Sequence, residues 1–199
     1  MRTIVWDRDD VLNDLMGCWF RQRWLVDHPG CALRYEGLTA NPPDAVLGVP
    51  RSEYLASLDR FRASGDYDAM EPLAEVRRWF QQNGQRYRHV VLTATTLTSA
   101  PAAAAWVFRH FGPWVRAFLF LPAHREAEDL PRYDSDKGQS LRWFGSADVL
   151  VDDSPANIEA ARREGVAGVL VPRPWNDARG TPADALAQLD DLLASMECP

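Results

Sequence analysis

The stretch TIVWDRDD, residues 3–10, decides the fold. Thr3–Trp6 form a continuous apolar run, which is typical of a central strand in a parallel sheet that is covered on both faces. Asp7, Asp9 and Asp10 crowd at its end. Their repulsion must be offset by a cation, by backbone N–H groups or by shifted pKa values. The alternative interpretation is a solvated turn with an acidic helix start, because aspartate favours both places.

Four further runs share this continuous apolar character. They are His89–Leu92, Ala117–Leu121, Asp148–Val151 and Gly168–Val171. Helical patterns lie between or after them, at residues 71–84, 98–112, 134–145, 153–165 and 184–196. This alternation predicts an α/β protein, with a Rossmann-like parallel sheet flanked by helices and ligands bound at the carboxyl ends of its strands.

Residues 14–70 interrupt the alternation. Two helical patterns, 13–27 and 51–64, flank a stretch rich in proline and glycine. We therefore expect an α/β core made of residues 1–13 and 71–199. A small, mostly helical cap, residues 14–70, would be inserted after the first strand and lie over the strand ends. Six arginines balance six acidic residues over positions 14–63, which favours a small substrate over a polynucleotide.

Five aromatic residues of the cap offer flat surfaces to a base or another ring, or else pack the cap against itself. They are Trp19, Trp24, Tyr35, Tyr54 and Phe61. Packing is the favoured interpretation, because aromatic residues at helical spacing usually form a buried face. His89, His110 and His124 show no spacing typical of metal ligands, and we expect ordinary surface or interface residues.

Composition narrows the function classes. The chain is 46% hydrophobic and 25% charged, which is normal for a globular protein. A net charge of −6 without a basic stripe disfavours a long nucleic-acid partner. Three widely spaced cysteines without a CxxC pair are typical of reduced thiols. Without a signal peptide or an apolar run near the roughly 18 residues that span a bilayer, we expect a soluble, cytoplasmic protein with no membrane partner. Both a monomer and a homodimer remain open.

Residues suited to phosphate chemistry follow three of the expected strands and precede one helix. They are Asp7, Asp9, Thr93, Ala94, Lys137, Asp152 and Asp153. Each alone has an ordinary explanation, such as a solvated lysine or an Asp-Asp-Ser helix cap. In a parallel sheet, however, all of these strand ends lie on one edge. Their order and context therefore favour a site over a set of unrelated surface residues.

The residue types at this edge suit a phosphate bound beside a metal ion. Asp7 and an aspartate of the 152–153 pair can hold a hard divalent cation such as Mg²⁺. Thr93, backbone N–H groups near Ala94, and Lys137 would bind the phosphate oxygens. Asp7 would attack phosphorus and form an aspartyl-phosphate. Asp9 would protonate the leaving alcohol and later activate water, so it must hold a proton for part of the cycle.

The chain resembles the haloacid dehalogenase superfamily of phosphatases, whose four motifs appear in order. They are the run ending Asp7-Arg8-Asp9-Asp10-Val11-Leu12, then Val90-Val91-Leu92-Thr93, then Lys137, then Val149-Leu150-Val151-Asp152-Asp153-Ser154. The resemblance covers roughly residues 1–14 and 70–175. It implies a Rossmann-like sheet, Mg²⁺ dependence and a helical cap between the first two motifs.

The resemblance also implies roles for these residues. Asp7 corresponds to the nucleophile and Asp9 to the acid/base. The cation would be bound by Asp7, the carbonyl of Asp9 and Asp153, with Asp152 assisting. True dehalogenases lack the second aspartate, so the presence of Asp9 disfavours carbon–halogen cleavage.

Within the superfamily the chain most resembles the cap-bearing 5′(3′)-deoxyribonucleotidase-like group. The similarity rests on Leu92-Thr93-Ala94, on Trp106 in the next helix and on Pro174-Trp175-Asn176. Thr95-Thr96 stand where that group often has Arg-Pro, which removes one anion contact. The expected activity is hydrolysis of a small phosphate monoester, with a nucleotide 5′-monophosphate as one candidate. A phosphotransferase or mutase, and a non-catalytic phosphate-binding module, are the alternatives.

Overall fold

Five parallel strands form one sheet in the order β3-β2-β1-β4-β5. The computed structural model describes residues 1–123, 125, 130–131 and 133–197. The strands are β1 (Thr3–Trp6), β2 (Arg88–Thr95), β3 (Val115–Pro122), β4 (Val149–Asp152) and β5 (Ala167–Leu170). The central strand β1 pairs with β2 and β4, so that Val5 lies opposite Val90 and Leu150. The strands that carry the first, second and fourth groups of polar residues are therefore neighbours.

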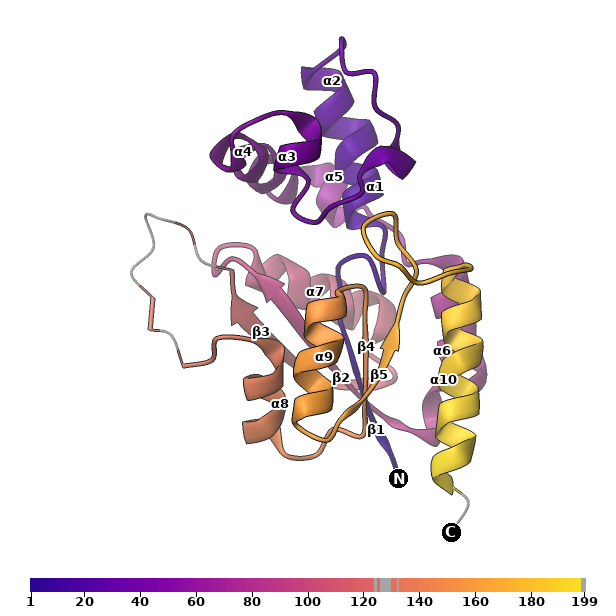
Figure 1. Ribbon diagram of the computed structural model, residues 1–199. Helices are drawn as coiled ribbons and strands as arrows, with labels where there is room; N and C mark the ends of the chain where they lie inside the picture. Colours follow the sequence, from indigo (N-terminus) through magenta and orange to yellow (C-terminus); the bar gives the residue numbers. More distant parts are fainter. Residues whose placement is uncertain (124, 126–129, 132, 198–199) are drawn as a thin grey trace.

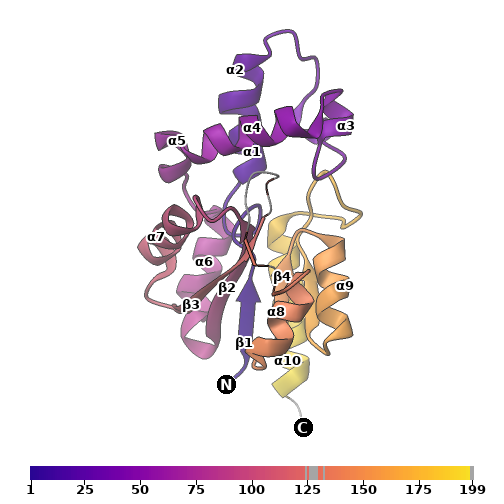
Figure 2. The same cartoon turned by 90° about the vertical axis from the view of Figure 1, so that its left-hand side faces the viewer.

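Helices cover both faces of the sheet (Figures 1 and 2). One face packs against α6 (Ala74–Asn83), α7 (Ala100–Phe111) and α10 (Pro182–Glu197), and the other packs against α8 (Lys137–Phe144) and α9 (Pro155–Arg163). Ile4 and Trp6 of β1 belong to the hydrophobic cluster on the first face, and Val5 belongs to the cluster on the other face. Because both faces are buried, the strand is apolar on both sides from Ile4 to Trp6. The predicted fold class is confirmed.

His89 lies in the core rather than at the surface, so that expectation was wrong. Its Nδ1 accepts a hydrogen bond from Trp6 Nε1 at 3.0 Å, and its Nε2 lies 3.0 Å from the carbonyl oxygen of Gly84. Both ring nitrogens therefore have a hydrogen-bond partner within the protein, which offsets the free-energy cost of burying the ring. Burial lowers the pKa of His89 to about 4. His110 packs against Trp106, and His124 lies outside the described residues.

A third hydrophobic cluster holds together the helices that lie beyond the carboxyl ends of the strands (Figures 1 and 2). Its helices are α1 (Leu15–Trp19), a π-helix (Phe20–Trp24), α2 (Leu25–Asp27), α3 (Asp44–Leu47), α4 (Arg51–Arg62) and α5 (Gly65–Asp68). Trp19, Trp24 and Phe61 are at most 2% exposed within this cluster, so the packing interpretation is confirmed for them. Tyr35 packs edge-on against Trp175.

The boundaries of the elements differ from the expected ones by a few residues. Strand β2 continues through Thr95, so Thr93 lies within the strand instead of after it. Strand β4 ends on Asp152 and α8 begins on Lys137. Among the described helices, none combines the length and the apolar character needed to cross a bilayer.

Candidate active site

A sharp turn after β1 places its aspartates at one cavity. The N–H of Asp7 continues the sheet by donating to the carbonyl of Val151 at 2.9 Å. Asp10 then adopts a left-handed conformation with φ of 62°, which aspartate tolerates better than most residues. Arg173 Nε donates to the carbonyl of Asp10 at 2.7 Å and holds the turn. Asp7 and Asp9 both line the cavity as a result.

Three buried carboxylates meet beyond the ends of β1 and β4. Asp7, Asp152 and Asp153 each offer an oxygen, and these oxygens lie within 4.8 Å of one another. Asp7 is 7% exposed and Asp153 is 5% exposed. Lys137 Nζ lies 3.0 Å from Asp7 Oδ2 and 2.7 Å from Asp152 Oδ2. The alternative of a solvated acidic turn is therefore wrong for Asp7.

Lys137 reaches this position because α8 packs closely on α9. The helix begins at Lys137 with Asp136 as its N-cap, whose side chain accepts from the N–H of Gln139 at 2.9 Å. A Cβ on the next residue, Gly138, would lie 2.6 Å from the carbonyl oxygen of Ala160. Glycine thus permits the close approach of the two helices. Lys137 is 1% exposed, so it is not the solvated charge that a lone lysine before a helix usually is.

The two aspartates at the end of β4 are held by different partners. Asp152 Oδ1 accepts from the N–H of Ser154 at 2.9 Å and from Asn157 Nδ2 at 3.0 Å, while its Oδ2 contacts Lys137. Asp153 Oδ2 accepts from Trp175 Nε1 at 2.6 Å. Asp153 lines the cavity and Asp152 does not. Asp152 therefore serves chiefly to position Lys137, and Asp153 keeps an oxygen toward the cavity side.

The electrostatics of this cluster call for additional positive charge. Burial raises the pKa of Asp7 to about 7, although Lys137 opposes this shift. Burial and the neighbouring carboxylates raise the pKa of Asp153 well above its usual range. Three carboxylates face one ammonium group, and oxygen ligands are those that Mg²⁺ prefers. The residues present therefore fit a divalent cation.

Asp9 lies outside this carboxylate group and contacts arginines instead. Its Oδ1 accepts from Arg8 Nη1 at 2.6 Å, and its Oδ2 accepts from Arg62 Nη2 at 3.1 Å. Burial would raise the pKa of Asp9, but the two guanidinium groups outweigh burial and hold this pKa below its usual range. In this conformation Asp9 is an ionised carboxylate. The predicted acid/base role also requires Asp9 to hold a proton for part of the reaction, and these contacts oppose that protonated form.

Arg8 is a component of the site that the sequence did not reveal. Its side chain is fully buried between the rings of Tyr67 and Trp106, whose centroids lie 4.6 Å and 4.7 Å from Cζ. Its Nη1 also donates to the hydroxyl of Tyr67 at 2.6 Å. A charged residue after a strand is usually solvated, so nothing in the sequence distinguished Arg8 from a surface arginine.

The three residues that the sequence predicts to bind phosphate lie in different positions relative to the cavity. Ala94 and Lys137 line the cavity, whereas Thr93 is 1% exposed and does not. The Thr93 Oγ1 is buried without a hydrogen-bond partner among the described residues. An unsatisfied buried hydroxyl is costly, which is consistent with a missing ligand oxygen. The role of Thr93 stays a prediction.

The cavity itself has a volume of about 310 Å³ and lies between the strand ends and the cap. The core contributes Asp7, Asp9, Asp153 and Lys137. The cap contributes Arg51, Tyr54 and Arg62, among others. Tyr54 is thus the one member of the five aromatic residues that lines this cavity.

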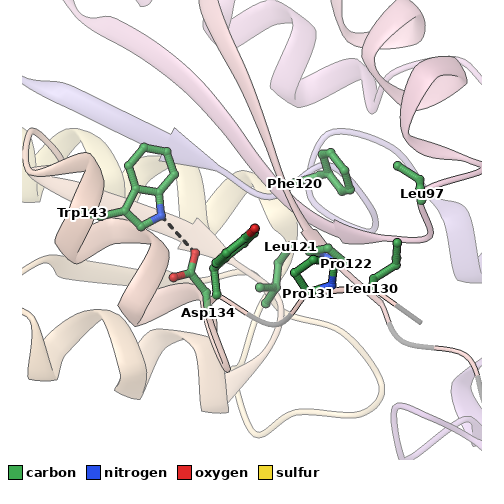
Figure 3. A pocket seen from close by; sticks show the side chains of 9 residues that line it. Leu97, Phe120, Leu121, Pro122, Leu130, Pro131, Asp134 and Trp143 are labelled. Carbon is green, nitrogen blue, oxygen red and sulfur yellow. Dashed lines mark hydrogen bonds between the residues drawn. The ribbon is translucent and has the colours of Figure 1, made fainter. Parts of the chain in front are cut away.

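A larger groove of about 540 Å³ lies beside the edge strand β3 (Figure 3). Its described lining is mainly apolar, with Phe120 and Leu121 from the strand and Trp143 from α8. Its carboxylate, Asp134, accepts from Trp143 Nε1 at 3.0 Å. No arginine or lysine occurs among its described lining residues. The described lining of this groove therefore offers no cation to a phosphate, despite the greater volume of the groove.

Comparisons with known proteins agree with this architecture. No protein-family model matches the sequence, and no curated protein matches it significantly. Among solved structures, a haloacid dehalogenase-like family hydrolase from Streptococcus pneumoniae superimposes with a TM-score of 0.62 at 12% identity, covering 99% of both chains. A haloacid dehalogenase-superfamily hydrolase of subfamily IA from Geobacter sulfurreducens gives 0.54 at 16% identity, covering 95% of this chain and 96% of that one.

A Thermotoga maritima protein assigned as a beta-phosphoglucomutase gives a TM-score of 0.59 at 15% identity, covering 96% of this chain and 100% of that one. The chain has the fold of the haloacid dehalogenase-like hydrolases. At these identities the similarity establishes the fold alone. The resemblance to the 5′(3′)-deoxyribonucleotidase-like group and the roles of individual residues stay predictions.

Proposed function

We propose that the protein is a Mg²⁺-dependent phosphatase that hydrolyses a small phosphate monoester through an aspartyl-phosphate on Asp7. The proposal rests mainly on the contact of Lys137 with both Asp7 and Asp152 inside a buried group of three carboxylates. Burying this many charges is expensive, and a site for a cation and a phosphate explains why they are gathered. The matching fold of several hydrolases supports the proposal.

Asp7 is the group best placed to attack phosphorus. Its Oδ1 accepts from the N–H of Arg8 at 2.7 Å and its Oδ2 contacts Lys137, so its orientation is fixed before a substrate arrives. Asp7, Asp153 and the carbonyl of Asp9, with Asp152 assisting, would hold Mg²⁺, which supplies positive charge against the phosphate oxygens. An oxygen of Asp7 bonds to phosphorus as the bond from phosphorus to the ester oxygen breaks.

Asp9 would complete both halves of the reaction. In the first half it gives a proton to the departing alcohol, and in the second it takes one from the water that attacks the phosphoryl group on Asp7. The contacts with Arg8 and Arg62 favour ionised Asp9, which suits the second half. Arg62 belongs to the cap, so a shift of the cap on substrate binding would weaken that contact and favour the first half.

A nucleotide 5′-monophosphate remains a candidate substrate within this proposal. The burial of Trp19, Trp24 and Phe61 in the cap leaves Tyr54 as the ring from that set beside the cavity. Stacking of a base would therefore rest on Tyr54. A screen of nucleotides, sugar phosphates and phosphorylated cofactor precursors with Mg²⁺ would identify the accepted esters.

The decisive test is Asp7→Asn, assayed with a generic aryl phosphate and Mg²⁺. Without its nucleophile, the enzyme should lose more than about 10⁴-fold in kcat/KM, with an unchanged circular dichroism spectrum. Asp66→Asn changes an exposed aspartate of the cap and is the matched control, which should keep wild-type activity. Hydrolysis by Asp7→Asn at a rate near the wild type would refute the mechanism.

The same residues would also serve phosphoryl transfer to an acceptor other than water. The Thermotoga maritima structure makes this a relevant alternative, because it shares the fold. Product analysis with and without a sugar-phosphate acceptor distinguishes the two reactions. Binding of Mg²⁺ and phosphate without turnover of any monoester would instead favour a non-catalytic module.

A further inference from the structure

One face of α4 lines the cavity along the length of the helix. The lining residues of this helix are Arg51, Tyr54, Leu55, Leu58 and Arg62. Their offsets of 3, 4, 7 and 11 residues from Arg51 place them on one side of a helix. At a rise of 1.5 Å per residue, the Cα atoms of the two arginines lie about 16 Å apart. The cavity wall thus has a cation at each end and mainly apolar side chains between them.

The two arginines are in different situations. Arg62 is buried, and it contacts Asp9 at 3.1 Å and Asp59 at 3.9 Å. Arg51 is exposed, and its side chain makes no ion pair or hydrogen bond with any described residue. Arg62 therefore belongs to the reaction centre, whereas Arg51 stands at the solvent end of the cavity with its charge uncompensated.

The acids of the cavity do not compensate Arg51. The carboxylates among its described lining residues are Asp7, Asp9, Asp10 and Asp153, and all of them come from the strand ends. The cap contributes none to this lining within the described residues. The equal numbers of arginines and acids in the cap sequence therefore conceal an uneven distribution, in which the cavity side is positive.

An ordinary surface arginine is the simpler alternative, and α4 contains one for comparison. Arg60 is 58% exposed, lies 3.7 Å from Asp27 and does not line the cavity. Arg51 differs from Arg60 in lining the cavity and in lacking an acidic partner among the described residues. These two differences indicate that Arg51 faces a ligand.

We propose that Arg51 binds a second anionic group of the substrate, at the end remote from the phosphate ester. The substrate class is an elongated phosphate monoester with an apolar middle, which would contact Leu55 and Leu58, and a terminal carboxylate or second phosphate. The volume of about 310 Å³ is at the lower end for small-molecule sites, so the substrate is small. This inference rests on the proposed function for the position of the phosphate.

Calorimetric binding of non-hydrolysable probes tests the inference without turnover. Phosphonopropionate, phosphonopentanoate and phosphonohexanoate would be titrated into the wild-type protein with Mg²⁺, alongside alkylphosphonates of equal length. The carboxylate should increase affinity, and more so for the longer chains, because Arg51 lies about 16 Å along α4 from Arg62, which contacts Asp9. Arg51→Gln should weaken binding of phosphonohexanoate by about 5- to 10-fold and leave the matched alkylphosphonate unchanged.

Arg60→Gln is the matched control, and this variant should still bind the carboxylate-bearing phosphonates more tightly than the alkylphosphonates of equal length. Alkane bisphosphonates form a second series, which shows whether the remote group is a carboxylate or a phosphate. The inference is overturned if no chain length shows an advantage for the second anion, or if Arg51→Gln retains that advantage. An advantage confined to the shortest chain would also overturn it, because the anion would then lie near Arg62.

The outcomes separate this inference from the proposed function. Hydrolysis of an aryl phosphate without any preference for a second anion would leave the phosphatase standing and refute the role of Arg51. If the protein hydrolyses no ester but binds carboxylate-bearing phosphonates more tightly in a way that depends on Arg51, the role of Arg51 stands and the phosphatase is refuted. If no phosphonate binds at all, both proposals fail.

Discussion

The α/β core and the cap present opposite charges to the same cavity. The core contributes Asp7, Asp9, Asp10 and Asp153 with two cations, Lys137 and Arg125, whereas the cap contributes Arg51 and Arg62 and no carboxylate among the described lining residues. The core half therefore suits a metal ion and, under the proposed function, the reacting phosphate, and the cap half suits further anionic groups of a substrate. In that proposal, reaction and recognition are separated in sequence and still share one small volume.

The core and the cap are each stabilised by a hydrophobic cluster of their own. Each buries a tryptophan completely and satisfies its indole N–H: Trp6 donates to His89 at 3.0 Å, and Trp19 donates to Ser57 at 3.2 Å. The core cluster spans sheet and helices, while the cap cluster draws mainly on residues 15–70. Changes in one region should therefore be separable from changes in the other.

The largest effect is expected from Lys137→Met, which strikes the core half of the cavity. Removing the ammonium group leaves Asp7 and Asp152 buried without their shared partner, which should cost about 3–5 kcal/mol in the free energy of unfolding. Urea denaturation measures this, and added Mg²⁺ should restore part of the loss. Arg142→Gln breaks an exposed pair with Glu164 and is the control. Equal stability of the two variants would mean that the buried pair is not critical.

An effect of similar size on stability is expected from each of the two buried tryptophans. Trp6→Ala and Trp19→Ala each remove a fully buried ring, which costs about 3–5 kcal/mol in a well-packed core. Hydrogen exchange should rise throughout the molecule for Trp6→Ala, but only within residues 14–70 for Trp19→Ala. Faster exchange in β1 and β4 of Trp19→Ala would show that cap and core unfold as one unit, against the separation described above.

The sequence predicted the sheet because each strand is covered on both faces. Thr3–Trp6 was located to the residue, and the neighbours β2 and β4 were displaced by only a few positions. The polar residues at the strand ends were also found, because their place after an apolar run depends on local sequence alone. Parallel pairing then brings Asp7 and Asp153 together without further information.

Contacts that depend on tertiary packing could not be predicted in this way. The burial of Arg8 requires the rings of Tyr67 and Trp106, which come from distant segments. Similarly, His89 is buried because Trp6 and Gly84 satisfy its nitrogens. The stripe from Arg51 to Arg62 is visible in the sequence, but no pattern says which face of α4 turns toward the cavity.

A smaller effect should come from His89, which belongs to the core alone. Its pKa is about 4 in the folded protein and 6.5 ordinarily, so below 6.5 the unfolded chain takes up a proton that the folded protein does not. Stability is therefore lost as pH falls from 6.5 toward 4, by about 2 kcal/mol between pH 7 and pH 5. His89→Gln should lack this component, which urea denaturation at both pH values would measure. Identical pH dependence of the two proteins would contradict the buried, neutral imidazole.

The smallest effect concerns Asp59, an acid of the cap that does not line the main cavity but contacts two arginines that do. It receives two 2.7 Å hydrogen bonds from Arg125 and lies 3.9 Å from Arg62. Asp59→Asn keeps the shape but removes the negative charge, so the positive potential of the cap side should rise. Because this pair is partly exposed, stability should fall by about 1 kcal/mol or less.

Affinity for phosphonohexanoate should then increase in Asp59→Asn, by about 2- to 5-fold at low ionic strength, and the gain should shrink in salt. The sign of the change carries the argument. An increase means that Asp59 competes with the substrate for the charge of the arginines. A decrease would mean that Asp59 positions these arginines for binding. In that case, affinity for the ligand would depend more on the geometry of the arginine side chains than on the net charge of the cap side. Asp66→Asn, on the same cap but outside the cavity lining, controls for the loss of one negative charge.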